Sequence, residues 1–447
     1  MFLLRYNEAH ERRQVAHLFW YCLIRMAKSH HTVGLDIGSA TVRAVIAELP
    51  HDDGPLKIVG VGTVPSVGIR RGIVVQPEEV AKSINAALEA AERMAGVAVD
   101  SVSCSVSGAD LFAQSAIGVI AVGKADGEVT EDDLARIVEE TQARTVLGAN
   151  KEILHVVPQH YRLDDQGGIK DPVGLKGVRL ELSSLVIGTG SNHLKNLIRS
   201  LELAGISARH FIAEPLASAE AILSAKQKEL GVVIVNIGAN TTSLAIFEDG
   251  DLLHLAVLPV GGSHITNDIA IGLRVSIDVA EAVKLQYGHA IPAEVGKKEA
   301  IDLSEFDSQE TDEVSRYHVA EIITARLEEI FHYVNLELKS INREALLPAG
   351  VILTGGGILV PGAVELAKRQ LRLPAQIGYP KPLGGILDQV DGPASATVVG
   401  LLLLSLDEGN SSDRFTFGGA SQFLNRLPGD WDGFAGKAKG LFRRFLP

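Results

Sequence analysis

The sequence predicts an α/β protein of two similar lobes, with an extra α+β subdomain inserted into the first lobe. Residues 33–46 (VGLDIGSATVRAVI) and 232–247 (VVIVNIGANTTSLAIF) predict the lobes, because each places a turn of glycine and small hydroxyl residues between two apolar β-rich runs. Each stretch is typical of a β-hairpin whose turn offers N–H groups and hydroxyls to a phosphate. Residues 114–195 break this repeated pattern, which predicts the insertion.

The two hairpins share one spacing. Asp36 and Asn236 hold equal places in them, and so do the glycines and threonines that follow. A tandem duplication of one domain is the economical explanation. Two such hairpins that face each other would hold a phosphate chain from both sides.

Composition limits the class of protein. A chain of 447 residues with 46% hydrophobic content suits about three domain-sized units with large cores. Cys22 and Cys104 share no short spacing, which excludes a disulfide framework and a CxxC zinc site and suits a reducing cytosol. A net charge of -13 argues against a nucleic-acid partner. No apolar run reaches the roughly 20 residues that a transmembrane helix needs.

Residues 1–31 are expected to form an N-terminal extension outside the fold. Residues 15–24 (VAHLFWYCLI) follow two arginines and superficially resemble a signal peptide, but no small-residue cleavage site comes after them. Met26 opens MAKSHHTVGLDIG just ahead of the first strand. We therefore expect Met26 to be the start, and residues 1–25 to come from a mis-called upstream start codon.

The first lobe continues as strand, helix and strand. Residues 58–67 and 99–106 are expected strands, and a helix between them opens at Pro77, keeps helical spacing of apolar residues and stops at Gly96. Further on, a short strand leads into a helix of small residues at 214–223.

The insertion is expected to contain strands at 116–122, 153–163 and 178–187 and a helix capped by Thr130. Residues 118–125 (GVIAVGKA) approach a P-loop, but Ala125 stands where Ser or Thr must ligate magnesium, so strand and turn are expected there. Ser191 is expected to cap the next helix, over 194–203.

The second lobe adds several elements after its hairpin. A strand at 252–259 runs into Gly261 and Gly262, and an apolar strand at 351–353 runs into a glycine turn at 354–357 that lets a flat ligand approach. The expected helices are 265–273, 279–287, 322–338 and 393–404, and residues 294–316 are expected to form a surface excursion.

Two phosphate hairpins, a third glycine turn and two connecting helices of small residues resemble the actin, Hsp70 and sugar-kinase ATPase superfamily. Within it the chain resembles the FtsA family of bacterial cell division proteins, over roughly residues 32–405 and the tail. The stretches that carry this closer resemblance are ILHVVPQHY (153–161), IKDPVGLKGVRLE (169–181), EPLASAEAIL (214–223) and VGGSHITNDIAIGL (260–273).

The resemblance implies a duplicated actin-like (ribonuclease H-like) fold in which the usual outer subdomain of the first lobe is replaced by one inserted elsewhere. The implied division is subdomain 1A (32–113, 196–225, 391–406), inserted subdomain 1C (114–195), subdomain 2A (226–262, 322–390), subdomain 2B (263–321), a linker (407–430) and a membrane-targeting helix (431–447).

The resemblance also implies ATP and Mg²⁺ as cofactors. The residues expected to bind the nucleotide are Asp36, Gly38, Ser39, Ala40, Thr41, Gly238, Ala239, Asn240, Thr241, Thr242, Gly261, Gly262, Glu281, Lys284, Gly355, Gly356 and Gly357. An ordinary helical ion pair is the alternative explanation of Glu281 and Lys284.

Three candidate catalytic residues follow. Asp36 would hold Mg²⁺ through water, and Glu214 would approach the metal's water shell. Asn236 stands where a third carboxylate is expected, and an amide carries no charge and cannot act as a base. We therefore expect nucleotide binding with weak or absent hydrolysis.

The last 17 residues predict an interfacial membrane helix, because apolar side chains share one helical face and basic residues flank it. The residues expected at the membrane are Phe434, Lys437, Ala438, Leu441, Phe442, Arg443, Arg444, Phe445 and Leu446. A helix docked on the protein's own body is the alternative, and the polar segment 407–419 argues against it.

By resemblance, the expected function is an actin-like adaptor on the cytoplasmic face of the inner membrane at the septum. It would tether the tubulin-like protein FtsZ through 2B, self-associate through 1C and recruit later division proteins. A PilM-type pilus scaffold shares this architecture, but a basic amphipathic tail is not expected there. A chaperone ATPase would need a peptide-binding β domain, and a small-molecule kinase would need a catalytic aspartate that nothing in the sequence nominates.

Overall fold

The computed structural model describes residues 31–49, 54–307, 312–386 and 388–406. The expected linker, the membrane helix and all of the N-terminal extension except His31 lie outside these residues. Within the described part, no helix combines the length and the apolar character that crossing a membrane requires.

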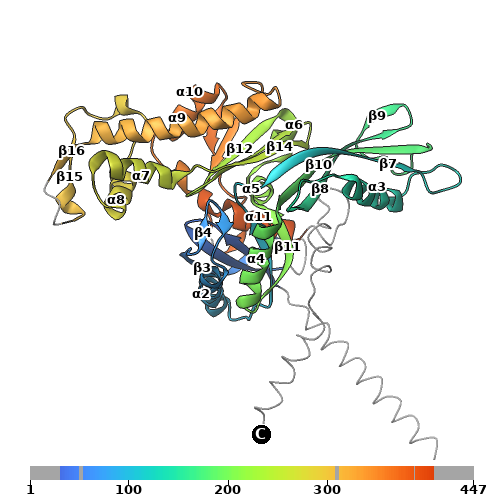
Figure 1. Cartoon of the computed structure of the whole chain (residues 1–447), viewed down its shortest axis with the longest axis horizontal. Coiled ribbons are helices and arrows are strands. Elements are labelled where there is room, and N and C mark those ends of the chain that lie inside the picture. Colours follow the sequence, from blue (N-terminus) through green and yellow to red (C-terminus); the bar gives the residue numbers. More distant parts are fainter. Residues whose placement is uncertain (1–30, 50–53, 308–311, 387, 407–447) are drawn as a thin grey trace, which may run out of the picture.

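The first lobe is built on a six-stranded sheet of order β11-β6-β1-β2-β3-β19. Helices α2 (Pro77–Ala95) and α4 (Ser191–Leu203) lie on the side of the sheet shown at the bottom of Figure 1, and α11 (Ala396–Leu404) packs against β1, β2 and β6. A two-strand ribbon of β4 (Ile69–Arg70) and β5 (Ile73–Val74) precedes α2. The six strands are β1 (His31–Ile37), β2 (Thr41–Glu48), β3 (Lys57–Pro65), β6 (Ser101–Val106), β11 (Ser207–Ala213) and β19 (Gly384–Gly385).

The second lobe repeats this sheet. Its order is β14-β13-β12-β17-β18, and β12 pairs antiparallel with β13 and parallel with β17, as β1 pairs with β2 and β6. This matching topology confirms the predicted duplication. The strands are β12 (Val232–Ile237), β13 (Thr242–Glu248), β14 (Asp251–Leu258), β17 (Val351–Thr354) and β18 (Ala375–Ile377).

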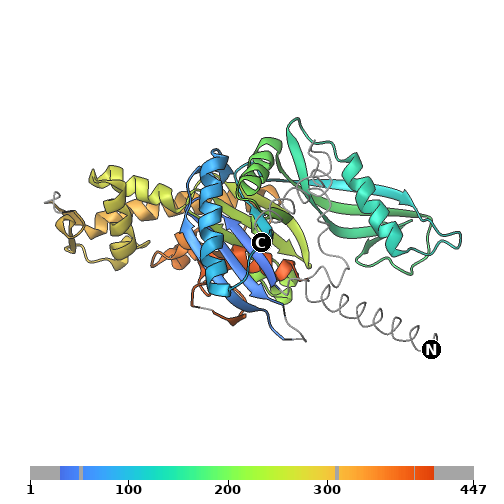
Figure 2. The same ribbon diagram turned by 90° about the horizontal axis from the view of Figure 1, so that it is seen from below.

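Helices complete the second lobe. The surface excursion expected at 294–316 contains a small sheet of β15 (Ala300–Asp302) and β16 (Glu313–Ser315). Figures 1 and 2 place α7, α8 and α9 at one end of the long axis of the molecule and the insertion at the other. The helices are α7 (Gly262–Leu273), α8 (Ile277–Tyr287), α9 (Arg316–Ser340) and α10 (Ala363–Leu371).

The insertion is a four-stranded antiparallel sheet of order β7-β10-β8-β9 with α3 packed on it. Thr130 caps α3 as predicted, because its hydroxyl accepts from the Asp133 N–H while the Asp133 carboxylate accepts from the Thr130 N–H. The glycine stretch at 118–125 is the end of a strand and a turn, as expected. The elements are β7 (Phe112–Ala121), α3 (Glu131–Arg144), β8 (Lys151–Leu163), β9 (Gln166–Ile169) and β10 (Arg179–Gly190).

Two expectations for the insertion need correction. Ser191 does not cap α4, because the helix already begins at this residue and the Ser191 hydroxyl donates to Glu152 at 2.9 Å. The short strand β9 was not expected, since its glycines give it no alternation of apolar and polar residues.

Two helices of small residues cross between the lobes. Helix α5 (Glu214–Ile222) packs against both α11 and β13, and the apolar core that contains α11 runs on into β12 and β13. A Cβ atom at Gly400 of α11 would lie 1.8 Å from the Ala217 carbonyl oxygen of α5. The absence of a side chain at Gly400 therefore sets how closely the two helices approach.

We expect the substitution Gly400→Ala to destabilise the fold by about 1–3 kcal/mol, because the added methyl group must push α5 and α11 apart. Urea unfolding would measure this loss. Gly392→Ala is the matched control, because its methyl group would meet nothing within 4 Å. Equal midpoints for the two variants would contradict the tight helix crossing.

Candidate functional site

A cavity of about 580 Å³ lies between the lobes, where the turns of the two hairpins meet α7, α8 and the third glycine turn. The predicted residues that line it are Asp36, Gly38, Ser39, Ala40, Thr41, Glu214, Asn236, Gly238, Ala239, Thr241, Gly262, Glu281, Lys284, Gly355, Gly356 and Gly357. The structure thus gathers residues from six separate parts of the sequence around one space.

The two hairpin turns have the same local geometry. The Gly38 N–H donates to the Thr41 carbonyl at 3.0 Å, and the Gly238 N–H donates to the Thr241 carbonyl at 2.9 Å. In the first turn the Ser39 hydroxyl accepts from the Gly72 N–H at 3.1 Å. The duplication predicted from sequence therefore extends to the hydrogen bonds of both turns.

Helix α7 begins directly against the second turn. Its Gly262 N–H donates to the Gly238 carbonyl, and its Ser263 N–H donates to the Ala239 carbonyl, both at 2.8 Å. A Cβ atom at Gly261 would lie 2.6 Å from the Gly238 carbonyl oxygen, so glycine is needed for this close contact. The N-terminus of α7 therefore borders the cavity, where its partial positive charge favours an anion.

The third glycine turn packs on the second hairpin. Gly355 has φ +89°, and a Cβ atom there would lie 2.2 Å from Asn236 Oδ1. A side chain at this position would collide with both the amide and the Ile237 backbone. The turn thus presents open backbone to the cavity next to Asn236.

Asp36 is a half-buried carboxylate at the first hairpin. The Ser105 hydroxyl donates to Asp36 Oδ1 at 2.8 Å and itself accepts from the Ile37 N–H at 3.1 Å. Burial raises the pKa of Asp36, and the Ser105 hydrogen bond and the charge of Arg43 act in the opposite direction. Arg43 stands opposite Asp36 in the hairpin register, so one strand pair supplies a carboxylate and a guanidinium beside the cavity.

Glu214 is the second carboxylate of the cavity, and it is buried, with 8% of its surface exposed at the start of α5. Its Oε1 accepts hydrogen bonds from the Asn236 amide, from the Ser218 hydroxyl at 2.8 Å and from the Thr397 hydroxyl at 3.3 Å. Burial raises the pKa of Glu214, the side chains of Ser243, Ser218 and Asn236 oppose the shift, and the nearby charge of Asp36 adds to it. The Asn236 side chain thus gives Glu214 a neutral donor where an aspartate would give it a second negative charge.

The oxygen atoms of this site fit Mg²⁺ carried by a phosphate chain. Among the described residues, no group of three or more His, Cys, Asp or Glu side chains could hold a metal by itself. Asp36 and Glu214 offer the hard carboxylate oxygens that Mg²⁺ accepts alongside waters and phosphate oxygens. Asp36 is the residue that would hold the ion, through water.

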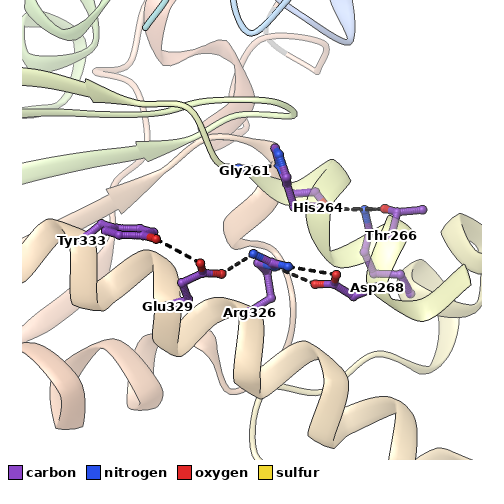
Figure 3. A network of polar contacts seen from close by, with 9 residues as sticks. Gly261, His264, Thr266, Asp268, Arg326, Glu329 and Tyr333 are labelled. Carbon is purple, nitrogen blue, oxygen red and sulfur yellow. Dashed lines mark hydrogen bonds and ion pairs between the residues drawn. The ribbon is translucent and has the colours of Figure 1, made fainter. Parts of the chain in front are cut away.

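Glu281 and Lys284 form the far wall of the cavity on α8. Lys284 Nζ contacts Glu281 Oε2 at 2.6 Å and donates to the Thr266 hydroxyl of α7 at 2.8 Å. Helix α7 is also bonded to α9, because Arg326 donates to both carboxylate oxygens of Asp268 at 2.6 and 2.9 Å (Figure 3). Glu281 and Lys284 are therefore an ion pair, as the alternative explanation held, and they also line the cavity.

Three predicted residues do not line the cavity. Thr242 is buried and its hydroxyl donates to the Val260 carbonyl at 2.8 Å, so this side chain supports the loop before α7. Gly261 packs against the second turn, and Asn240 lies in that turn without contributing to the cavity wall.

Several residues that line the cavity were not predicted from the sequence. Arg43 and Ser243 follow Thr41 and Thr241 by two positions, and alternation along a strand points such residues to one face, so this signal could have found them. No comparable spacing in the sequence marks the apolar residues that line the cavity. The missed residues are Arg43, Ser107, Ser243, Ser263, Ile265, Leu285, Leu359, Val360, Pro361, Ala394 and Thr397.

Known proteins resemble this chain in sequence and in fold. The family model for Cell division protein FtsA matches residues 233–400, and the model for the SHS2 domain inserted in FtsA matches residues 108–188. The cell division protein FtsA of Pseudomonas aeruginosa is 36% identical over 389 residues, covering 87% of this chain and 92% of that protein. The FtsA protein of Bacillus subtilis is 36% identical over 370 residues, covering 83% of this chain and 82% of that protein.

A solved structure of the PilM-PilN type IV pilus biogenesis complex shares the fold. It has a TM-score of 0.61 at 18% identity and covers 84% of this chain and 98% of that one. The predicted actin-like fold with an inserted subdomain is confirmed. Because the sequence relatives span most of the chain, the chain belongs to the FtsA family of cell division proteins.

Proposed function

We propose that this FtsA-family protein is an ATP-binding actin-like adaptor that anchors FtsZ to the cytoplasmic face of the inner membrane at the septum. It self-associates there with the Z ring and recruits later division proteins. Nucleotide binding is supported by the two equivalent turns that face one cavity between the lobes.

The cavity suits ATP in a definite orientation. The two hairpin turns and the N-terminus of α7 would hold the phosphates, because the helix dipole there favours negative charge. The third glycine turn and the Glu281–Lys284 pair would hold the nucleoside, and Asp36 would hold Mg²⁺ through water. Asn236 donates to Glu214, so the site lacks a third carboxylate and hydrolysis is weak or absent.

Membrane anchoring rests on the sequence of residues 431–447. Apolar burial of one helical face, with roughly 1 kcal/mol for each basic residue near anionic lipid, holds the adaptor at the bilayer. By family resemblance, FtsZ docks on subdomain 2B (263–321), and subdomain 1C (114–195) carries self-association. The likeness to PilM is one of fold at 18% identity, whereas the FtsA protein of Pseudomonas aeruginosa is 36% identical to this chain over 389 residues.

We expect Asn236→Asp to raise steady-state ATP turnover about ten-fold, below the roughly 10²–10⁴ that a fully placed acid–base residue contributes. The new carboxylate would lie beside Glu214 and attract the cation that the amide does not. Phosphate release would measure turnover, with the exposed Asn342→Asp as the matched control for added charge. Unchanged turnover in Asn236→Asp would refute Asn236 as the cause of weak hydrolysis.

Removal of the tail should abolish lipid binding. A chain that ends at Leu406 is expected to stay in the bottom fraction during flotation with vesicles that contain anionic lipid, while the full chain floats. Phe442→Gln should weaken flotation because it places an amide on the apolar face, and Gly436→Gln on the opposite side should not. Equal flotation of the full and shortened chains would exclude the tail as the anchor.

The adaptor role predicts that FtsZ polymers co-sediment with vesicles only when the full chain is present. The chain that ends at Leu406 should still bind FtsZ polymers and leave them unattached to lipid. If the full chain bound neither FtsZ nor vesicles, the pilus-scaffold or kinase alternatives would be favoured.

A further inference from the structure

The stretch ILHVVPQHY (153–161) lies far from the phosphate turns in sequence, and the cavity lining contains none of it. It forms most of strand β8 in the insertion. Two of its side chains contact residues outside the insertion. One contacts the first lobe, and the other contacts the second lobe.

His155 contacts the first lobe directly beside a cavity residue. It is fully buried, and its Nε2 accepts a hydrogen bond from the Ala213 N–H at 3.0 Å. Burial, with a contribution from the nearby His210, lowers the pKa of His155 to about 3, so the ring is neutral and its proton lies on Nδ1. Ala213 is the residue before Glu214 and caps α5. The imidazole thus holds the end of the helix that carries the buried carboxylate.

Gln159 and Lys170 contact the second lobe. The Gln159 amide donates to the Leu252 carbonyl of β14 at 2.7 Å. Lys170, one residue beyond β9, donates to the Asp249 carbonyl at 3.2 Å and pairs with the Asp251 carboxylate. Strands β7, β8 and β10 also pack against β14, whose apolar side chains share one core with those of the insertion.

Strand β13 connects the contacts between the insertion and the second lobe to the cavity. It runs from Thr242, next to the second phosphate turn, to Glu248, next to the turn that Lys170 contacts. Its seven residues span about 20 Å. Because β13 is hydrogen-bonded on both sides, it forms a continuous hydrogen-bonded connection between the phosphate turn and the turn that Lys170 contacts.

The chain segments that enter and leave the insertion contact each other. Asp110, just before β7, accepts from the Gly190 N–H at 3.1 Å and contacts His193 Nδ1 at 3.0 Å. The two chain crossings into the insertion are therefore hydrogen-bonded to each other, and the β8–β9 hairpin adds contacts to the second lobe farther along the insertion.

We propose that the β8–β9 hairpin couples the occupancy of the cavity to the position of the insertion, with His155 as a positioning residue for Glu214 and with Gln159 and Lys170 as the links to the second lobe. This inference rests on the proposed nucleotide binding. Coupling of this kind is reciprocal, so a partner that binds the insertion changes nucleotide affinity by the same factor.

Hydrogen exchange on the full chain, with and without ATP and Mg²⁺, tests the coupling. In the wild-type chain, nucleotide should slow exchange in the β8–β9 hairpin about three-fold or more. Gln159→Leu should remove this response while it keeps nucleotide protection at the phosphate turns. His160→Leu, an exposed neighbour on the same strand, is the matched control and should respond like the wild type.

Titration of ATP affinity tests His155. His155→Leu leaves the Ala213 N–H without its acceptor and should raise the Kd for ATP about five-fold or more. His155→Gln supplies an acceptor oxygen and should restore most of the affinity. A His155→Leu chain with a lower Tm and wild-type affinity would show a purely structural role and overturn the assignment.

The two proposals fail in different ways. If ATP binds the wild-type chain and the hairpin exchanges at the same rate, or if Gln159→Leu responds like the wild type, the coupling is wrong and nucleotide binding stands. If ATP does not bind the wild-type chain by direct titration, the nucleotide proposal is wrong and the coupling falls with it.

Discussion

The close crossing of α5 and α11 is the constraint on which the rest of the structure depends. At Gly400 the two helices approach until backbone meets backbone, and this distance sets how the two sheets face each other. The same crossing places Glu214, Ser218 and Thr397 in one hydrogen-bonded group at the lobe interface. A cavity between the lobes is a consequence of this geometry, because the hairpin turns lie at the ends of the strands that the crossing holds together.

The site itself is asymmetric although the fold is duplicated. Asp36 receives a hydroxyl hydrogen bond from Ser105, whereas Asn236 at the equivalent place donates its amide to Glu214. The first hairpin therefore brings a carboxyl group to the cavity, and the second brings an amide that orients the carboxylate of α5. The two lobes therefore share one backbone geometry at their turns and supply different side-chain groups to the cavity.

Much of the architecture could be predicted from local patterns. The twin hairpins, the helix that Pro77 opens and Gly96 ends, and the Thr130 capping box depend on residues close together in sequence, and the structure confirms them. Ser191 was misread because a serine before an apolar helix is a capping signal only when its backbone is non-helical, which sequence does not reveal. The apolar wall at Leu285, Leu359 and Pro361 could not be predicted, because it forms only where segments distant in sequence meet.

The packing of the insertion on β14 bears on how this protein could have evolved. β14 is the outermost strand of its sheet, and its Leu252 and Leu255 are almost completely buried in a core that the insertion shares. A chain that lost the insertion would expose the apolar side chains of an edge strand, a combination that promotes aggregation. Replacement of the insertion by that of a relative therefore has to preserve an apolar surface that matches Leu252 and Leu255 of β14.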